Sequence, residues 1–236
     1  MGKYLRDIVL SCRKEIDPEF SFKLQTNFLE ILYLDCLPQT RTDGVGKVII
    51  EACQNLPIEP RQSPRAGQQI ELENMIDVLR LNALFDFAAY FAASKEVRKR
   101  IALEFLQDGL LKVATIRGWQ TSTFHEAYKA VLAKDLISYR PWSKPVTSPD
   151  RKHKAQVWCK YDSDAAEVLL IISHRKNVVS KTSVVTVKPG DVWIRGAIGE
   201  LRWLSTDRVE LIPRKSKRDW ETQYEPVQVS LAQNHR

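Results

Sequence analysis

The side chains best suited to chemistry are few in this chain of 236 residues, and they lie far apart. The histidines are His125, His153, His174 and His235. No two of them have the spacing that places two metal ligands on one helix face. The cysteines, at positions 12, 36, 53 and 159, form no Cys-x-x-Cys motif. The sequence therefore predicts no metal centre and no cofactor.

A catalytic nucleophile is not indicated either. His174 follows Ser173, but neighbouring residues of a strand point to opposite faces, so these two side chains do not form a nucleophile–base pair. One enzymatic alternative remains. Asp191 and the Glu200-Leu-Arg202 segment are expected on neighbouring strands, where two carboxylates could hold a divalent metal beside a scissile phosphate. Since oxygen-ligand sites usually contain more than two carboxylates, a metal-dependent nuclease is the alternative rather than the main prediction.

The positive charge is concentrated in the second part of the chain. Residues 1–139 contain eighteen Lys and Arg and eighteen Asp and Glu, whereas residues 140–236 contain eighteen and eleven, which accounts for the formal net charge of +7. Two clusters, residues 140–154 and 213–218, each carry a net +4. This asymmetry indicates two units with different partners, the basic one favouring an anionic macromolecule.

Five of the six tryptophans also lie in the basic part. An expected strand over 155–161 places Trp158 and Lys160 on one face, and an expected strand over 191–195 does the same for Trp193 and Arg195. Flat aromatic rings among cations suit single-stranded nucleic acid, because bases stack on the rings while the cations meet phosphates. The alternative is that the helices cover this face and the tryptophans serve only for packing.

The predicted partner-binding residues combine this aromatic face with the two basic clusters. If the first and last strands lie close together, the clusters form one patch of seven cations. The complete predicted set is Trp158, Lys160, Trp193, Arg195, Arg202, Arg151, Lys152, Lys154, Arg214, Lys215, Lys217 and Arg218.

The first 139 residues are predicted to form a neutral bundle of about five or six helices. A stripe of apolar residues over 4–12 has helical spacing, and Asp17-Pro18-Glu19 is a helix-start signal for a helix that ends near Cys36. Gly109 is interpreted as a kink or a break, and Thr123 with Glu126 as a capping box. Further helices are expected over 45–55, 68–93, 95–118 and 123–137.

Residues 140–154 contain three prolines and are predicted to be a basic connector. Short runs with period two then follow, separated by turn signals, and predict a small antiparallel sheet or half-barrel domain over 155–213. Residues 214–236 are predicted to be a basic, then polar, C-terminal tail. The expected strands are 155–161, 167–174, 183–187, 191–195, 199–204 and 208–212.

The resulting fold class is α+β, and the predicted location is cytoplasmic. The most apolar stretch, residues 75–93, is too polar and too short for a bilayer, so no membrane partner is expected, and scattered cysteines fit a reducing compartment. The predicted function is a non-enzymatic binding or regulatory protein. Its basic β domain would engage nucleic acid or an acidic protein surface, as an inhibitor or immunity-type protein does. A scaffold protein that binds no nucleic acid is a further alternative.

Overall fold

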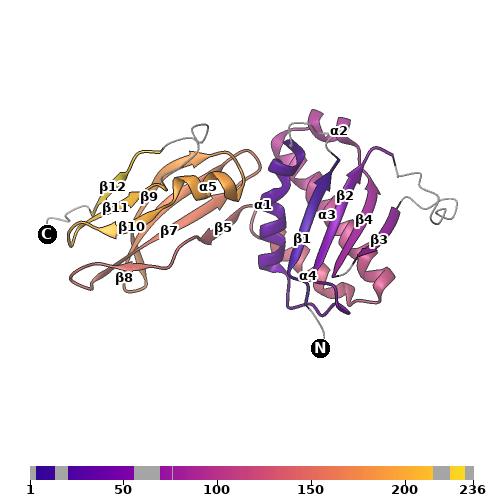
Figure 1. The fold of residues 1–236 in the computed structure, drawn as a ribbon, viewed down its shortest axis with the longest axis horizontal. Helices are drawn as coiled ribbons and strands as arrows, with labels where there is room; N and C mark the ends of the chain where they lie inside the picture. The colour runs from indigo at the N-terminus through magenta and orange to yellow at the C-terminus, as the bar shows by residue number, and fades with distance from the viewer. Residues whose placement is uncertain (1–3, 14–20, 56–69, 76, 215–223, 232–236) are drawn as a thin grey trace. The chain divides into compact units, whose positions relative to one another are not determined.

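The computed structural model describes residues 4–13, 21–55, 70–75, 77–214 and 224–231. The chain divides into two compact units, residues Met1–Leu136 (unit 1) and Ile137–Arg236 (unit 2) (Figure 1). Because residues 137–139 are uncharged, unit 1 is formally neutral and unit 2 carries the whole net charge of +7.

Unit 1 is built on a four-stranded sheet with the order β1-β2-β4-β3 (Figure 1). Strands β1, β2 and β4 are parallel, and β3 pairs antiparallel with β4 at one edge. The strands are β1 (Asp7–Cys12), β2 (Lys47–Cys53), β3 (Ile70–Met75) and β4 (Val78–Leu84).

Two rows of aliphatic side chains cross the three parallel strands and form the core of the sheet. Ile8, Val48 and Leu79 are in register in one row, and Leu10, Ile50 and Leu81 in the next. All six are fully buried, whereas the residues between the two rows, Val9, Ile49 and Arg80, are partly exposed. This alternation with period two is what places one face of each strand against the helices.

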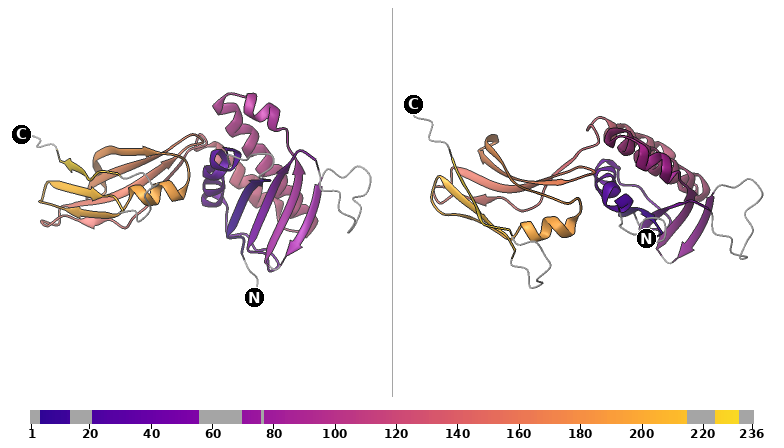
Figure 2. Two further views of the ribbon diagram at one scale, coloured as in Figure 1. Left: turned by 45° about the horizontal axis from the view of Figure 1, so that its top comes forward. Right: turned by 90° about the horizontal axis from the view of Figure 1, so that it is seen from above.

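Four helices complete unit 1, namely α1 (Ser21–Cys36), α2 (Phe87–Ala92), α3 (Lys95–Arg117) and α4 (Thr121–Leu132). Helices α1, α3 and α4 contact one another, and α3 also contacts β2 and β4. Figure 2, in its right-hand view, shows α1 and α3 on one side of the sheet. The buried Tyr33 hydroxyl of α1 donates to the Phe124 carbonyl of α4 at 2.9 Å and lies 2.5 Å from Gln107 Oε1 of α3, so it joins all three helices.

The predicted N-terminal helical bundle is therefore wrong. The segments 4–12 and 45–55 contain strands β1 and β2, and the segment 68–93 contains β3, β4 and the short helix α2. In β1 and in the first half of β2 and β4 the buried apolar residues recur every second position, and this period is stronger than the helical stripe read from the same letters. The helix ending at Cys36 and the helix over 95–118 do match α1 and α3.

Two smaller expectations about helix starts have different outcomes. Asp17-Pro18-Glu19 lies outside the described residues. The capping box is wrong, because α4 begins earlier, with Gln120 at the N-cap position, and the Thr123 hydroxyl donates instead to the Gln120 carbonyl at 2.8 Å.

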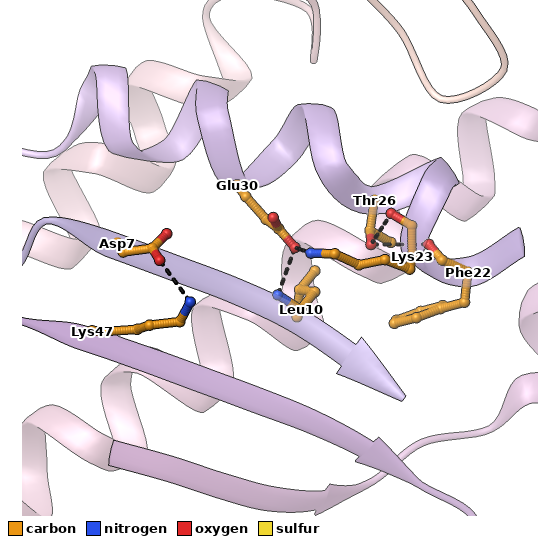
Figure 3. Close-up of polar contacts among 7 residues, drawn as sticks. All are labelled: Asp7, Leu10, Phe22, Lys23, Thr26, Glu30 and Lys47. Carbon is orange, nitrogen blue, oxygen red and sulfur yellow. Dashed lines mark hydrogen bonds and ion pairs between the residues drawn. The ribbon is translucent and has the colours of Figure 1, made fainter. Parts of the chain in front are cut away.

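The outer edge of β1 is closed by a side chain from α1. The Leu10 backbone N–H donates to Glu30 Oε1 at 2.7 Å, and the same oxygen accepts from Lys23 Nζ at 2.5 Å (Figure 3). Glu30 is only 6% exposed, and this burial raises the pKa of its carboxyl to about 7, against the lowering effect of Lys23. A buried carboxyl thus replaces the strand partner that an edge N–H would otherwise need.

Gly109 does not break α3, which continues through it. A Cβ atom at this position would lie 2.5 Å from Ile50 Cδ1 and 3.0 Å from Ile50 Cγ2. The glycine therefore lets the helix lie directly on β2, since any side chain would occupy the space of Ile50.

We expect Gly109→Ala to lower the free energy of unfolding of unit 1. Alanine has the better helix propensity by about 1 kcal/mol, but forcing a methyl group into a filled core costs about 1–3 kcal/mol, so the net effect is destabilising. Urea denaturation of the single variants and of the double variant Gly109→Ala/Ile50→Val measures the coupling. Because Ile50→Val removes Cδ1, the double variant is expected to be more stable than additivity predicts; simple additivity would contradict the packing argument.

Unit 2 consists of two antiparallel sheets. In the first, the strand order is β5-β7-β8-β9, and β6 also pairs with β7; in the second, the order is β10-β11-β12. The first contains β5 (Ser138–Pro141), β6 (Val146–Thr147), β7 (His153–Tyr161), β8 (Ala166–His174) and β9 (Asn177–Val187). The second contains β10 (Glu200–Trp203), β11 (Arg208–Ile212) and β12 (Val227–Ser230).

The two sheets of unit 2 share one hydrophobic core, so they form a sandwich. Ala155 of β7 and Leu170 of β8 pack with Val209 of β11 and Val229 of β12. Trp203 of β10 packs against this core, and its indole N–H donates to the Val146 carbonyl of β6 at 3.0 Å.

The single meander predicted for 155–213 is thus replaced by two sheets, and three segments differ from expectation. The expected connector contains β5 and β6, and the expected tail contains β12. Residues 191–195 form part of α5 (Asp191–Ala197) rather than a strand. Ile194, Ala197 and Ile198 are buried at helical spacing, which explains why this segment packs as a helix.

Candidate functional site

The outer face of the first sheet of unit 2 carries the aromatic and basic residues that the sequence singled out on β7. Along β7, Ala155, Val157 and Cys159 are fully buried, whereas Trp158 and Lys160 are only partly buried. The predicted alternation of β7 is therefore confirmed. We call the face that bears Trp158 the outer face, because Ala155 on the other face packs into the core of the sandwich.

Two aromatic rings stack on this outer face. Tyr139 of β5 and Trp158 of β7 have ring centroids 4.8 Å apart and planes inclined by 27°. Tyr139 remains 41% exposed, and Lys181 Nζ of β9 lies 5.1 Å from the centre of its ring. The indole N–H of Trp158 donates to Gln156 Oε1 at 3.1 Å, which fixes the ring against its own strand.

The strand pairing of β7 determines which residues surround Trp158. Trp158 is directly opposite Pro141 of β5 on one side and Leu169 of β8 on the other. Leu169 is only 3% exposed although it belongs to the outer face, and Ile171 is likewise buried. The outer face therefore contains buried apolar residues, and the aromatic pair is its partly exposed part.

The charges of the outer face are mostly positive. Lys154 and Lys160 lie on β7 and Lys181 on β9, while Glu167 is directly opposite Lys160. Partial burial, and after it the Glu167 carboxylate, raises the pKa of Tyr139, so its phenol remains protonated at neutral pH. The tyrosine consequently adds no negative charge to the face.

Trp193 and Arg195 do not belong to this face. Both lie on α5, where Trp193 is partly buried and has Lys188 Nζ 5.4 Å from its ring centre, and Arg195 is exposed. The expectation that Trp158 and Trp193 share the polar face of one sheet is wrong, because it required a strand over 191–195.

Asp191 has a structural environment of its own at the start of α5. The Tyr161 hydroxyl donates to Asp191 Oδ1 at 3.1 Å, and Arg140 Nη2 lies 3.9 Å from the same oxygen. The Arg140 guanidinium also lies 5.3 Å from the centre of the Tyr161 ring. Asp191 thus joins α5 to β5 and β7.

The neighbouring strands on which the nuclease alternative was based are not formed. Asp191 begins a helix, and Glu200 is exposed at the first position of β10. Within the described part of the chain, no group of three or more His, Cys, Asp or Glu could hold a metal ion.

Arg202 is held by a carboxylate on the second sheet. Its Nε and Nη2 donate to Glu210 Oε2 at 3.0 and 2.8 Å, and Gln228 Nε2 donates to the other oxygen at 3.0 Å. These hydrogen bonds, those of Gln228 and Arg202 in that order, lower the pKa of Glu210. Arg202 is therefore a cross-strand partner within β10-β11-β12, not a member of the outer face.

The two basic clusters have different surroundings. Arg151 and Lys152 lie exposed in the turn between β6 and β7, with Lys152 Nζ 3.8 Å from Asp150 Oδ2. Arg214 is exposed beyond the end of β11. The start of β11 lies beside Trp203, which contacts β6 near that turn. Arg214 follows the other end of β11, so it lies away from the turn. Of the other four cations of the expected patch, Lys154 lies on β7, and Lys215, Lys217 and Arg218 lie outside the described residues.

Sequence reasoning missed Tyr139 and Lys181. Tyr139 was placed at the end of the expected helical part. In the structure it is exposed on β5, next to the buried Ser138. Lys181 lies in the long strand β9, of which only residues 183–187 were expected. A run rich in valine and threonine over 178–187 was the available signal for that longer strand.

The one cysteine of the sandwich is not a nucleophile. Cys159 is fully buried, and desolvation raises the pKa of its thiol to about 12. A thiol with such a pKa is protonated at neutral pH and unreactive.

Comparison with known proteins adds no relative. No protein-family model, no curated protein and no solved structure matches this chain. Among the helices that the structure describes, none has both the length and the apolar character needed to cross a bilayer.

Proposed function

We propose that this chain is a non-enzymatic binding protein, and that the outer face of its basic unit binds single-stranded nucleic acid. The observation that carries the proposal is the stacked pair of Tyr139 and Trp158, which is partly exposed and has Lys181 beside it. A regulatory role, such as that of an inhibitor or immunity-type protein, is part of the same proposal.

The pair has the chemistry that unpaired bases require. An exposed aromatic ring offers every base a surface for stacking, whatever its sequence, and lysines close to the ring reach the phosphates on either side. Lys154, Lys160 and Lys181 give the outer face three such cations against one acid, Glu167. Duplex DNA hides its bases from a flat ring of this kind, so single strands are the favoured ligand.

The type of cation supports nucleic acid over an acidic protein surface. Interfaces between proteins are enriched in arginine and depleted in lysine, because the planar guanidinium pairs well with carboxylates. The cations of the outer face are lysines, whereas Arg140 and Arg202 are held by carboxylates elsewhere in unit 2. An acidic protein partner remains an outcome of the test below.

The proposal includes a cytoplasmic location. The four cysteines, at positions 12, 36, 53 and 159, are scattered along the sequence, and Cys53 and Cys159 are buried. Scattered cysteines of this kind are typical of proteins in reducing compartments.

Fluorescence anisotropy with labelled single- and double-stranded DNA and RNA tests the proposal. We expect micromolar or tighter binding of single strands at low salt, weakening as salt rises, because contact with several phosphates releases counterions. The triple variant Lys154→Glu/Lys160→Glu/Lys181→Glu is expected to lose binding and to flatten the salt dependence.

The matched comparison is the triple variant Lys215→Glu/Lys217→Glu/Arg218→Glu, which makes the same charge change in the C-terminal cluster. If only this second variant loses binding, the partner is engaged by the tail and the outer face is not the site. No binding of any nucleic acid at low salt would reject the proposal and leave an acidic protein surface as the class of partner.

A further inference from the structure

Two histidines that lie far apart in sequence are direct neighbours in unit 2. His153 and His174 form the last pair of the β7–β8 ladder, and their ring centroids are 5.3 Å apart with planes inclined by 55°. Both side chains are partly buried at the end of the sandwich, and the ring of Trp203 lies 6.4 Å from that of His153.

The separation of the two rings fits a shared metal ion. An imidazole nitrogen binds Zn²⁺ at about 2.0–2.1 Å, and two imidazoles at the tetrahedral angle then have ring centres roughly 5 Å apart. The tilt between the planes is compatible with this arrangement, whereas stacked rings would hold their nitrogens side by side and leave no position for an ion.

One nitrogen of the pair has an unexplained environment. Nδ1 of His153 is buried, and within the described residues it has no hydrogen-bond partner. Buried polar atoms are almost always satisfied, and an exception points to a bound water or ion. The ring of His153 contacts the ring of His174 and the indole of Trp203, whose N–H is already donated to the Val146 carbonyl.

We propose that His153 and His174 bind one divalent transition-metal ion of the imidazole-preferring class, such as Zn²⁺, Ni²⁺ or Cu²⁺, with water as the remaining ligands. Hard cations such as Mg²⁺ and Ca²⁺ prefer oxygen ligands and would not bind there. The site does not belong to the outer face. His153 lies on the same face of β7 as Ala155 and Val157, which are buried in the core.

The charges around the pair are mostly positive. Asp150 is close enough for its carboxylate to interact with His153, and it is held in place by the Ser148 hydroxyl at 2.7 Å and the Lys152 backbone N–H at 3.2 Å. Lys152 and Lys154 flank His153, and Arg175 and Lys176 follow His174. Such surroundings do not attract a cation, so affinity would depend on the imidazoles.

A bound ion would also fix the end of the sandwich. It would connect the turn before β7 to the turn after β8, next to Trp203 of the second sheet. We therefore expect metal to stabilise unit 2 and to change the fluorescence of Trp203.

Isothermal titration of the full chain with ZnCl₂ and NiCl₂ tests the site, in a background carrying His125→Gln and His235→Gln so that only the proposed pair remains. We expect one ion per chain, and at least about tenfold weaker binding for His174→Gln. Undiminished binding in His174→Gln, or no binding of either ion up to about 1 mM, would overturn the proposal.

Cu²⁺ quenching of tryptophan fluorescence gives a readout that folding defects do not mimic. The chain is expected to be quenched with the same stoichiometry as in the titration, and Trp203→Phe to bind the ion while losing most of the quenching. Quenching that is unchanged by both Trp203→Phe and His174→Gln would place the ion elsewhere and refute the site.

Discussion

A variant in which Tyr139 and Trp158 are both alanine is expected to bind single-stranded DNA on the order of 10²- to 10³-fold more weakly than the unaltered chain. Stacking on an aromatic side chain contributes about 1–3 kcal/mol per base, and both rings of the outer face are removed. Because Lys154, Lys160 and Lys181 remain, the slope of affinity against salt concentration should change little. Anisotropy titrations at three salt concentrations measure both quantities.

The controls for this prediction use the same chemistry at matched positions. Tyr139→Phe/Trp158→Phe keeps two flat rings and should retain most of the affinity, while Trp193→Ala removes a tryptophan of α5 and should have no effect. Thermal melts exclude unfolding as the cause, since Trp158 is partly buried. Equal affinities for the double alanine variant and the unaltered chain would show that the aromatic pair has no part in binding.

The free energy of unfolding of unit 1 is expected to fall as pH rises from about 4.5 to about 7. The pKa of Glu30 is raised to about 7 in the folded chain, and an unfolded glutamate has its ordinary value of 4.5. The folded state therefore binds the proton of Glu30 more tightly than the unfolded state does. The stabilisation that this proton gives is complete below pH 4.5 and is lost as pH rises through 7. The loss is about 3 kcal/mol, at 1.4 kcal/mol per unit of pKa.

Glu30→Gln isolates this effect from the titration of other groups. An amide oxygen can still accept from the Leu10 N–H, so the edge of β1 remains closed while the titration is removed. The difference in unfolding free energy between the variant and the unaltered chain, measured in urea at intervals from pH 4 to 8, should shift in favour of the variant across this window. A difference that stays constant with pH would mean that the carboxyl is not titrating in the buried position.

Lys23→Gln gives the opposite control. Both the charge and the hydrogen bond of Lys23 lower the pKa of Glu30, so their removal should raise the pKa further and move the window to higher pH. A window that moves to lower pH would show that Lys23 does not act on Glu30 as the geometry indicates (Figure 3).

The sequence predicted unit 2 better than unit 1, for a physical reason. In β7 one face is core and the other is outer surface, and the period of two is clear over nine residues, whereas β8 is recognised by its continuous apolar run over residues 168–172. In β2 and β4 the last residues are buried on both faces, as Glu51, Ala52 and Asn82 show, so the alternation is lost where helix and strand patterns overlap.

The candidate site was predictable only within single elements. That Trp158 and Lys160 share a face follows from the alternation along β7. That Tyr139 stacks on Trp158, or that His153 meets His174, depends on pairing between strands that are separate in sequence, and no local pattern contains this register. Trp193 was misplaced because a segment of five residues is too short to distinguish a strand from a helical turn by its pattern.

Photo-crosslinking of a single-stranded oligonucleotide that contains 5-iodouracil, followed by mass spectrometry of the digested protein, tests the account most directly. A base stacked on the outer face would be in contact with Tyr139 or Trp158, and crosslinks to one of these two residues are the predicted result. Crosslinks confined to other residues, or none under conditions where the oligonucleotide binds, would contradict the claim that the outer face is the nucleic-acid site.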